Sequence, residues 1–302
     1  MRNSQFAIPF LHSAIEIMTP FLLAAIGGLF TELSGMLNIA LEGLMLAGAF
    51  FCVTFAATTG NLFLGILLGI LCTMLLSLLF GMTTIYLKAN VFITGLATNL
   101  FASGFTVMLA FQLFGTKGVI QFPNIPRLPV LMVPDSLQRI PFVGDILFGH
   151  NVIVYLSWLI VAIATVVIYR TPFGMRLRGT GMNRQTIVSL GLSPGRYQLV
   201  GMLISGFTCA LAGSMLTIQL AAFVPEISAG RGWIALVAIY LGNRTPAGIL
   251  VASFIFGLSE SFSNYAQGTI RIPSDFILAF PYLITIVAMI LYSVWRQSRR
   301  GT

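Results

Sequence analysis

Four polar side chains are candidates for a functional role, since they lie within or beside long apolar runs: Asn38, Glu42, Asn99 and Glu260. Lipid strongly disfavours such groups, so each must face a cavity, a loop or another helix. Lining a path, they would replace the water hydrogen bonds that a polar solute loses on leaving solution. Buried between helices, they would instead be packing hydrogen bonds worth roughly 0.6 kcal/mol each. The sequence leaves both interpretations open. Asn38 and Glu42 are four residues apart, so a helix over both would place them on one face.

No catalytic or metal-binding pattern accompanies these residues. A phosphate-binding loop needs a Gly-Lys pair followed by Ser or Thr, and neither Lys88 nor Lys117 follows a glycine. The three cysteines lie in apolar segments without a CxxC pair, which is typical of small core residues. His12 and His150 are far apart in the chain. The sequence therefore predicts neither an enzyme nor a metal site, and no cofactor in this chain.

Composition places the chain in the membrane. Of its 302 residues, 57% are hydrophobic and 8% charged, and the mean hydropathy is +0.96. A spanning helix needs roughly 20 apolar residues, so we expect an all-α polytopic membrane protein with about nine spans, within a range of eight to ten. Residues 1–302 form a single transmembrane domain in this interpretation. The net charge of +8 reflects basic loops rather than a nucleic-acid surface, because no basic run is interleaved with aromatics.

The apolar runs predict where the spans lie. One expected span is short: residues 233–241 are too few to cross unless the helix is tilted or broken. The Pro-rich segment 115–150 cannot be a regular span, since each proline removes a backbone donor, and we expect an ordered loop outside the membrane. The expected spans are 12–30, a run ending near 57, 61–86, 91–114, 151–169, 197–221, 233–241, 247–264 and 275–295.

Residues 170–196 form the one long polar interruption, and they hold five of the sixteen Lys and Arg. Positive charge concentrates in cytoplasmic loops, so we expect this loop and the basic C-terminal tail to be cytoplasmic. Nine spans then place the N-terminus outside.

A short helix is predicted inside this loop. Asn183 is a good N-cap, residues 184–190 can form about two turns, and Gly191 ends them. Ile187 and Leu190 are three apart and would share an apolar face. That face could dock on another protein, or it could lie on the membrane surface.

Two stretches carry a resemblance to a known family. Residues 32–46 read E-x-S-G-x-x-N-I-x-x-E-G-x-M-L, and residues 169–191 read Y-R-T-x-F-G-x-x-x-R-x-x-G-x-N-x-x-x-x-x-x-L-G. Both resemble the inner-membrane permeases of ABC importers for ribose, branched-chain amino acids and nucleosides, and residues 228–236 add support. The first stretch is similar to the nucleoside and simple-sugar branch. The likeness spans about residues 12–295.

This resemblance implies a type II-like ABC importer permease bundle in the bacterial inner membrane, whose loop is a coupling helix docking on a separate ATPase. It implies three partners: a second, homologous permease, a cytoplasmic ATP-binding subunit that binds the ATP, and an extracytoplasmic substrate-binding protein. It implies nucleosides as substrate, with simple sugars or riboflavin as alternatives. An ion-coupled secondary transporter that uses the four polar residues is a further alternative. The expected coupling residues are Gly181, Asn183, Gln185, Ile187, Leu190 and Gly191.

Overall fold

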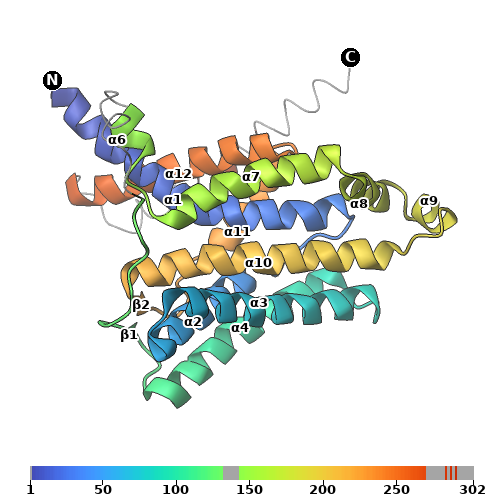
Figure 1. Cartoon of the computed structure of the whole chain (residues 1–302), viewed down its shortest axis with the longest axis horizontal. Helices are drawn as coiled ribbons and strands as arrows, with labels where there is room; N and C mark the ends of the chain where they lie inside the picture. The colour runs from blue at the N-terminus through green and yellow to red at the C-terminus, as the bar shows by residue number, and fades with distance from the viewer. Residues whose placement is uncertain (1, 132–142, 270–282, 284–285, 288–289, 291–302) are drawn as a thin grey trace.

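The computed structural model describes residues 2–131 and 143–269, together with residues 283, 286, 287 and 290. Long helices dominate, and two short strands pair near one end of the bundle (Figure 1). The elements are α1 (Arg2–Leu33), α2 (Leu41–Thr59), α3 (Leu62–Ile85), α4 (Val91–Phe114), β1 (Ile120–Gln121), α6 (Val143–Leu147), α7 (Val152–Arg170), α8 (Pro172–Met182), α9 (Arg184–Ser189), α10 (Pro194–Leu220), β2 (Ala222–Phe223), α11 (Arg231–Leu241) and α12 (Pro246–Thr269).

Asparagine side chains set where several helices begin. Asn61, Asn90 and Asn151 each stand just before a helix and accept hydrogen bonds from its first backbone N–H groups. These N–H groups have no partner inside their own helix, so the cap satisfies donors that lipid cannot. At the other end, α2 and α4 stop at Gly60 and Gly115, whose left-handed backbone suits glycine.

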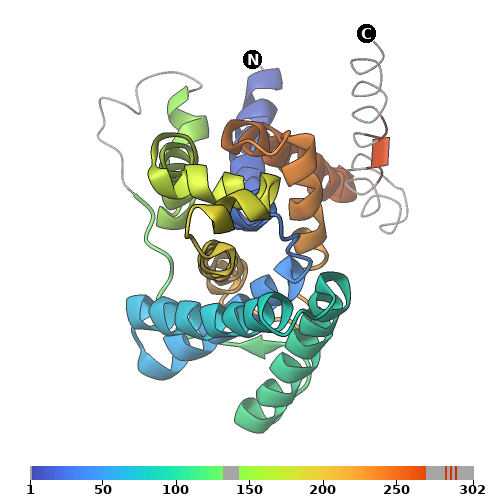
Figure 2. The same cartoon turned by 90° about the vertical axis from the view of Figure 1, so that its right-hand side faces the viewer.

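Helix α10 lies at the centre of the bundle. It packs against α1 on one side and against α2 and α3 on the other. Seen from the end that carries α8 and α9, helices α7 and α12 lie with α1, whereas α4 lies beyond α2 and α3 (Figure 2). Small residues allow the close approach: a Cβ on Gly213 of α10 would lie 2.2 Å from the backbone oxygen of Met45 on α2.

The predicted helices are largely confirmed. Among the described residues, seven helices are long and apolar enough to span a membrane, and they match seven of the nine expected spans. The expected span 275–295 lies outside the described residues. The count of nine therefore stays a prediction.

The short span is broken, as its length indicated. α11 has 11 residues, roughly 16 Å of helix against a hydrocarbon core of about 30 Å. The preceding residues 224–230 are not helical and lead from β2 to the start of α11. The chain thus passes between the two ends of the bundle partly as irregular backbone and partly as helix.

The described part of the Pro-rich loop is ordered, as expected. Ile120 pairs with Phe223 and Gln121 with Ala222 in an antiparallel ladder, and Val130 forms a bridge with Asn151. The loop is therefore tied to the end of α10 and to the start of α7. The sequence did not indicate this pairing, because two-residue strands carry no periodic pattern.

Candidate functional site

The first of the four polar residues, Asn38, lies in residues 34–40, an irregular segment inside the bundle between α1 and α2. Asn38 is 1% exposed. Its Nδ2 donates to Ser205 Oγ on α10 at 2.8 Å, and its Oδ1 accepts from Ala40 N at 3.0 Å. Ser205 is near the middle of α10, so the segment reaches deep into the bundle. Irregular backbone at that depth needs partners inside the protein, and Asn38 supplies them.

Asn99 supports the same segment from α4. Its Nδ2 donates to the Ile39 backbone oxygen at 3.0 Å, and its Oδ1 accepts from Gly43 N at 2.8 Å. Helix α4 packs against α2 here, with the Asn99 Cα only 2.7 Å from where a Cβ on Gly43 would be. One amide therefore satisfies both the last part of the irregular segment and the first turn of α2.

Glu42 connects α2 to α11. Its two carboxylate oxygens accept from Gly230 N at 2.8 Å and Gly232 N at 2.7 Å. Those N–H groups stand at the start of α11, where the helix dipole favours negative charge. A Cβ on Gly232 would lie 2.4 Å from Glu42 N, so the contact requires glycine. We call Asn38, Glu42, Asn99 and the backbone groups that they bind the polar junction.

The polar junction brings together three of the four predicted path residues. Their hydrogen bonds are made within the chain, which is the packing role that the sequence left open, and lining a path stays a prediction. No helix aligns Asn38 with Glu42, since α2 begins at Leu41. Asn38 precedes the helix, and its side-chain Oδ1 accepts from the Ala40 backbone N–H two residues on.

The fourth path residue, Glu260 on α12, forms an ion pair with Arg231 at 2.5 Å. Arg231 is the first residue of α11, between the two glycines that Glu42 binds.

Arg231 also lines a cavity of about 480 Å³. Polar groups from four helices face this cavity, and apolar residues of α1 and α10, together with Ile227, complete it. The polar lining residues are Glu16, Gln219, Arg231 and Asn264. None of these four was among the predicted path residues, although Gln219 and Asn264 also stand in apolar runs.

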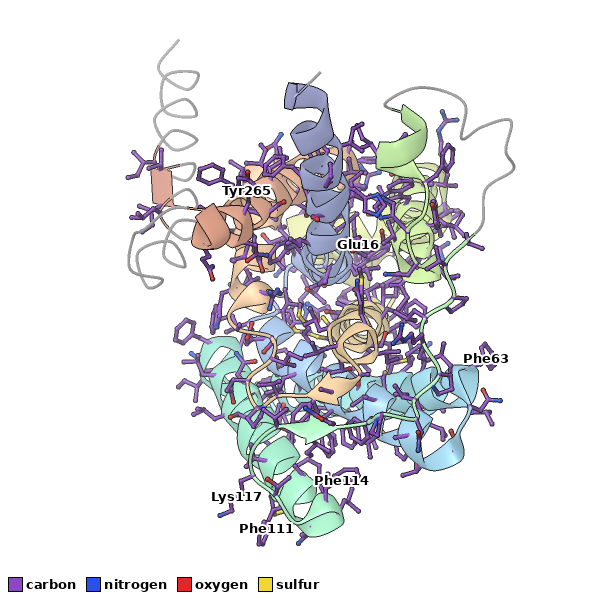
Figure 3. The ribbon with its side chains drawn as sticks, turned by 90° about the vertical axis from the view of Figure 1, so that its left-hand side faces the viewer. Glu16, Phe63, Phe111, Phe114, Lys117 and Tyr265 are labelled. Atoms are coloured by element: carbon purple, nitrogen blue, oxygen red, sulfur yellow. The ribbon has the colours of Figure 1, made fainter. Side chains whose placement is uncertain are left out.

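A second cavity of about 400 Å³ lies between α1 and α12 and shares Ile17 and Asn264 with the first. Tyr265 and Ser261 add polar groups to its lining. Figure 3 views this end of the bundle and shows Glu16 on α1 and Tyr265 on α12. The two cavities are large enough together for a small polar organic molecule.

Helices α8 and α9 occupy the opposite end of the bundle (Figure 1). Asn183 caps α9 as predicted, since its Oδ1 accepts from Gln185 N at 3.0 Å and Thr186 N at 3.2 Å. Gly191 follows α9 with φ +71°. The preceding helix α8 was not predicted, although Thr171 caps it and Pro172 opens it.

The prediction that Ile187 and Leu190 share one docking face is wrong. Ile187 is 4% exposed and Leu190 67% exposed. The Ile187 side chain lies over Gly179 of α8, whose absent Cβ leaves it room. α9 ends at Ser189, so Leu190 leaves the helical spacing and points outward. The exposed apolar side chains at this tip are Met182, Val188 and Leu190, and we call these three the α9 tip.

Gly181 of α8 fixes this helix on the bundle. A Cβ there would lie 2.4 Å from the Leu33 backbone oxygen at the end of α1 and 2.8 Å from Gly35 N. Gly35 has φ +81° and is the second residue of the irregular segment 34–40. The loop is therefore packed directly against the segment that carries Asn38.

The same end holds a second contact between distant segments. Arg244, in the turn after α11, pairs with Glu32 of α1 at 2.8 Å, and Tyr240 Oη donates to Glu32 at 3.2 Å. This places Glu32 and Arg244 at the same end of the bundle as α8 and α9.

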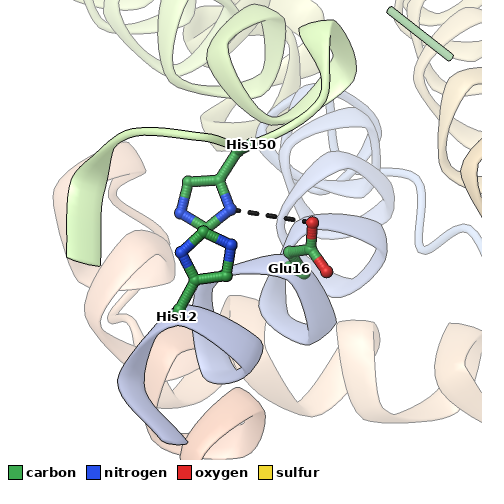
Figure 4. Close-up of side chains that lie close together, drawn as sticks. All are labelled: His12, Glu16 and His150. Atoms are coloured by element: carbon green, nitrogen blue, oxygen red, sulfur yellow. Dashed lines mark ion pairs between the residues drawn. The ribbon is translucent and has the colours of Figure 1, made fainter. Parts of the chain in front are cut away.

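At the other end, the fold brings together the two histidines, which are far apart in the chain. The rings of His12 on α1 and His150 before α7 stack with centroids 3.9 Å apart. His150 Nδ1 lies 3.7 Å from Glu16 Oε1, as Figure 4 shows. Sequence distance concealed this cluster, because nothing local indicates that α7 starts beside α1.

The seven long apolar helices define a multi-pass membrane protein. The family described as "Branched-chain amino acid transport system / permease component" matches residues 11–291, and the chain belongs to this family.

Individual relatives agree with that assignment. The chain is 33% identical to the nucleoside ABC transporter permease protein NupC of Lactococcus lactis, over 91% of this chain and 89% of that protein. It is 33% identical to the guanosine ABC transporter permease protein NupQ of Bacillus subtilis, over 89% of this chain and 87% of that protein. The fold resembles an inward-facing ABC transporter structure assigned to the metal-chelate type, with a TM-score of 0.54, 14% identity, and coverage of 94% and 86%.

Proposed function

We propose that this chain is the permease subunit of an ATP-driven nucleoside importer in the bacterial cytoplasmic membrane, without an ATPase site of its own. The names of the NupC and NupQ relatives support nucleosides as the substrate class. The partners are a second, homologous permease, a cytoplasmic ATP-binding subunit and an extracytoplasmic binding protein. The α8–α9 end and the C-terminus face the cytoplasm in this arrangement.

The observation that carries the coupling part of the proposal is the α9 tip. Met182, Val188 and Leu190 are all exposed at the end of a capped helical pair, within the most basic loop of the chain. Apolar side chains on a polar loop gain nothing from water, whereas a groove on an ATPase would bury them. Gly181, Asn183, Gln185 and Gly191 shape the pair, and Ile187 holds α9 on α8.

A continuous set of contacts leads from this tip to the cavity. α8 packs through Gly181 on residues 33–35, and residues 34–40 carry Asn38. A few residues further, Glu42 holds the start of α11, where Arg231 faces the cavity. These packed contacts support a route by which movement of α8 would reach Arg231.

The cavity chemistry fits a nucleoside. A ribose carries hydroxyls that need donors and acceptors, and a base offers a flat face with polar edges. Arg231, Gln219, Asn264 and Glu16 provide such groups, and the volume of about 480 Å³ falls in the usual range for small-molecule sites. A sugar would use the same groups without the base.

Uptake into proteoliposomes that contain all the subunits tests the substrate and the energy source. We expect labelled guanosine or adenosine to accumulate only with ATP, and unlabelled nucleosides to compete where glucose and riboflavin do not. Competition by glucose or riboflavin alone would overturn the nucleoside assignment. Accumulation driven by an ion gradient without the ATPase would instead favour the secondary transporter.

Arg231→Gln tests the role of the cavity. We expect slower uptake with the ATPase still bound, because the cavity loses its cation. Unchanged uptake kinetics would remove Arg231 from the path.

A further inference from the structure

The cluster of His12, Glu16 and His150 has the composition of a metal site. Two imidazoles and a carboxylate are ligands that Zn²⁺ and similar ions accept in a tetrahedral arrangement. One ligand atom from each residue lies within 4.8 Å of the others. In a tetrahedral zinc site with bonds near 2.1 Å, neighbouring ligand atoms are about 3.4 Å apart. The 3.7 Å between His150 Nδ1 and Glu16 Oε1 is already close to that spacing.

His150 is prepared to be a ligand. Its side chain is 0% exposed, and its Nε2 lies 2.9 Å from the Ile146 backbone oxygen. A carbonyl only accepts, so Nε2 is the protonated nitrogen in this contact, and Nδ1 is the nitrogen whose lone pair a metal ion can take. Metal-binding histidines are held in this way, with the second nitrogen donating to a carbonyl or carboxylate. His150 Nδ1 has no hydrogen-bond partner although it is buried.

The other two residues are held on one face of α1. His12 and Glu16 are four residues apart within α1, which brings them onto the same side of the helix. Glu16 Oε2 accepts from Gln219 Nε2 of α10 at 3.3 Å, which orients the carboxylate. Its other oxygen, Oε1, faces His150 (Figure 4).

We propose that His12, Glu16 and His150 bind a divalent transition-metal ion of the Zn²⁺ class, which ties α1 to the chain entering α7. The ligands would be one nitrogen of His12, Glu16 Oε1 and His150 Nδ1, with water in the fourth position. Because the two rings stack at an interplanar angle of 19° and an imidazole lone pair lies in its ring plane, the partly exposed His12 ring would turn out of the stack to share the ion. The site lies at the end of the bundle opposite α8 and α9 (Figure 1), which faces the outside in the proposed orientation. Metal binding here requires no nucleoside, so its test is independent of the proposed function.

Co²⁺ is the probe, because its visible absorption bands distinguish a tetrahedral protein site from the hydrated ion. The full chain is purified with an affinity tag that contains no histidine and titrated with CoCl₂. We expect tetrahedral bands that saturate at one ion per chain and are abolished by ZnCl₂. ZnCl₂, but not MgCl₂, should also raise the thermal unfolding temperature, since a ligand that binds the folded state stabilises it.

Three variants define the site. His150→Phe and His12→Phe keep an aromatic ring in the stack but remove a ligand, and each should abolish the bands. Glu16→Gln keeps the side-chain size but removes the charge, and should weaken Co²⁺ binding by more than about tenfold. Size-exclusion profiles identify any variant that fails to fold. If His150→Phe fails to fold, the Co²⁺ spectrum of His12→Phe tests the site instead, because His12 is partly exposed.

Several outcomes would overturn the proposal. One is the absence of tetrahedral bands in the wild-type protein, and another is their persistence in both Phe variants. A third is stabilisation of the protein by MgCl₂ to the same extent as by ZnCl₂. A thermal stability that depends on pH but not on metal would assign the cluster to an imidazolium–carboxylate pair alone.

Discussion

The polar junction and the α9 tip differ in which atoms they present and in the direction they face. In the junction, Asn38, Glu42 and Asn99 direct their polar atoms at backbone groups and a side chain of the same chain. At the tip, Met182, Val188 and Leu190 direct apolar atoms outward. A buried polar group needs a partner, and an exposed apolar group gains from acquiring one. The junction is thus complete within this chain, whereas the tip is suited to a second protein.

The largest expected effect is in the junction. Glu42→Ala removes the acceptor of two partly buried N–H groups at the start of α11, and a buried N–H group costs about 1 to 3 kcal/mol when left unpaired. We expect a large fall in the thermal unfolding temperature of the purified chain. Glu42→Gln keeps one acceptor oxygen, so its unfolding temperature should lie between those of the wild type and Glu42→Ala. An Ala variant as stable as wild type would show that the junction is not structural.

Next comes the buried side of α9. Ile187→Ala leaves a cavity between α9 and α8, for which buried Ile-to-Ala changes cost about 2 to 5 kcal/mol. Because the loss is local, we expect faster amide hydrogen exchange in residues 172–190 and unchanged exchange in α10. Ile187→Val should change little. Protection that stays intact in the Ala variant would contradict the burial of Ile187.

Asn99→Ala should have a smaller effect than Glu42→Ala. It leaves Gly43 N and the Ile39 oxygen unpaired, and an unsatisfied carbonyl is better tolerated than an N–H. We expect a loss of about 1 to 3 kcal/mol, read as a lower unfolding temperature. Asn99→Asp retains the acceptor for Gly43 N but not the donor, and separates the two contributions. If Asn99→Ala slowed uptake without any loss of stability, Asn99 would line the path instead.

The smallest effect on stability is expected at the α9 tip, where a substitution should nevertheless abolish ATP-driven uptake. Leu190→Asp changes an exposed residue, so the free energy of unfolding should move by less than about 0.5 kcal/mol. ATP-driven uptake and co-purification of the ATP-binding subunit should both be lost, because a carboxylate would be buried unpaired at the docking surface. Leu190→Met should keep both. Normal co-purification of the Asp variant would show that the tip does not dock.

How far the sequence predicts each region follows from the range of the interactions involved. The Asn183 cap was predictable, because an N-cap acts within three residues. The direction of Ile187 was not, since it depends on Gly179 of the helix before it. Glu42 was recognisable as a carboxylate that must avoid lipid, but its partner Gly230 is 188 residues away. No local pattern specifies such a pairing.

The sequence by itself determined the membrane class, the position of most helices and the basic loop, because hydropathy, capping and charge are local properties. It also determined which residues lipid would reject. Only the tertiary structure decided what those residues contact: Glu42 with the start of α11, Arg231 with Glu260, and His12 with His150. Helices in a membrane are apolar on every side, so periodicity does not tell one neighbour from another. Close packing of small residues and the need to pair each buried polar group select the neighbours.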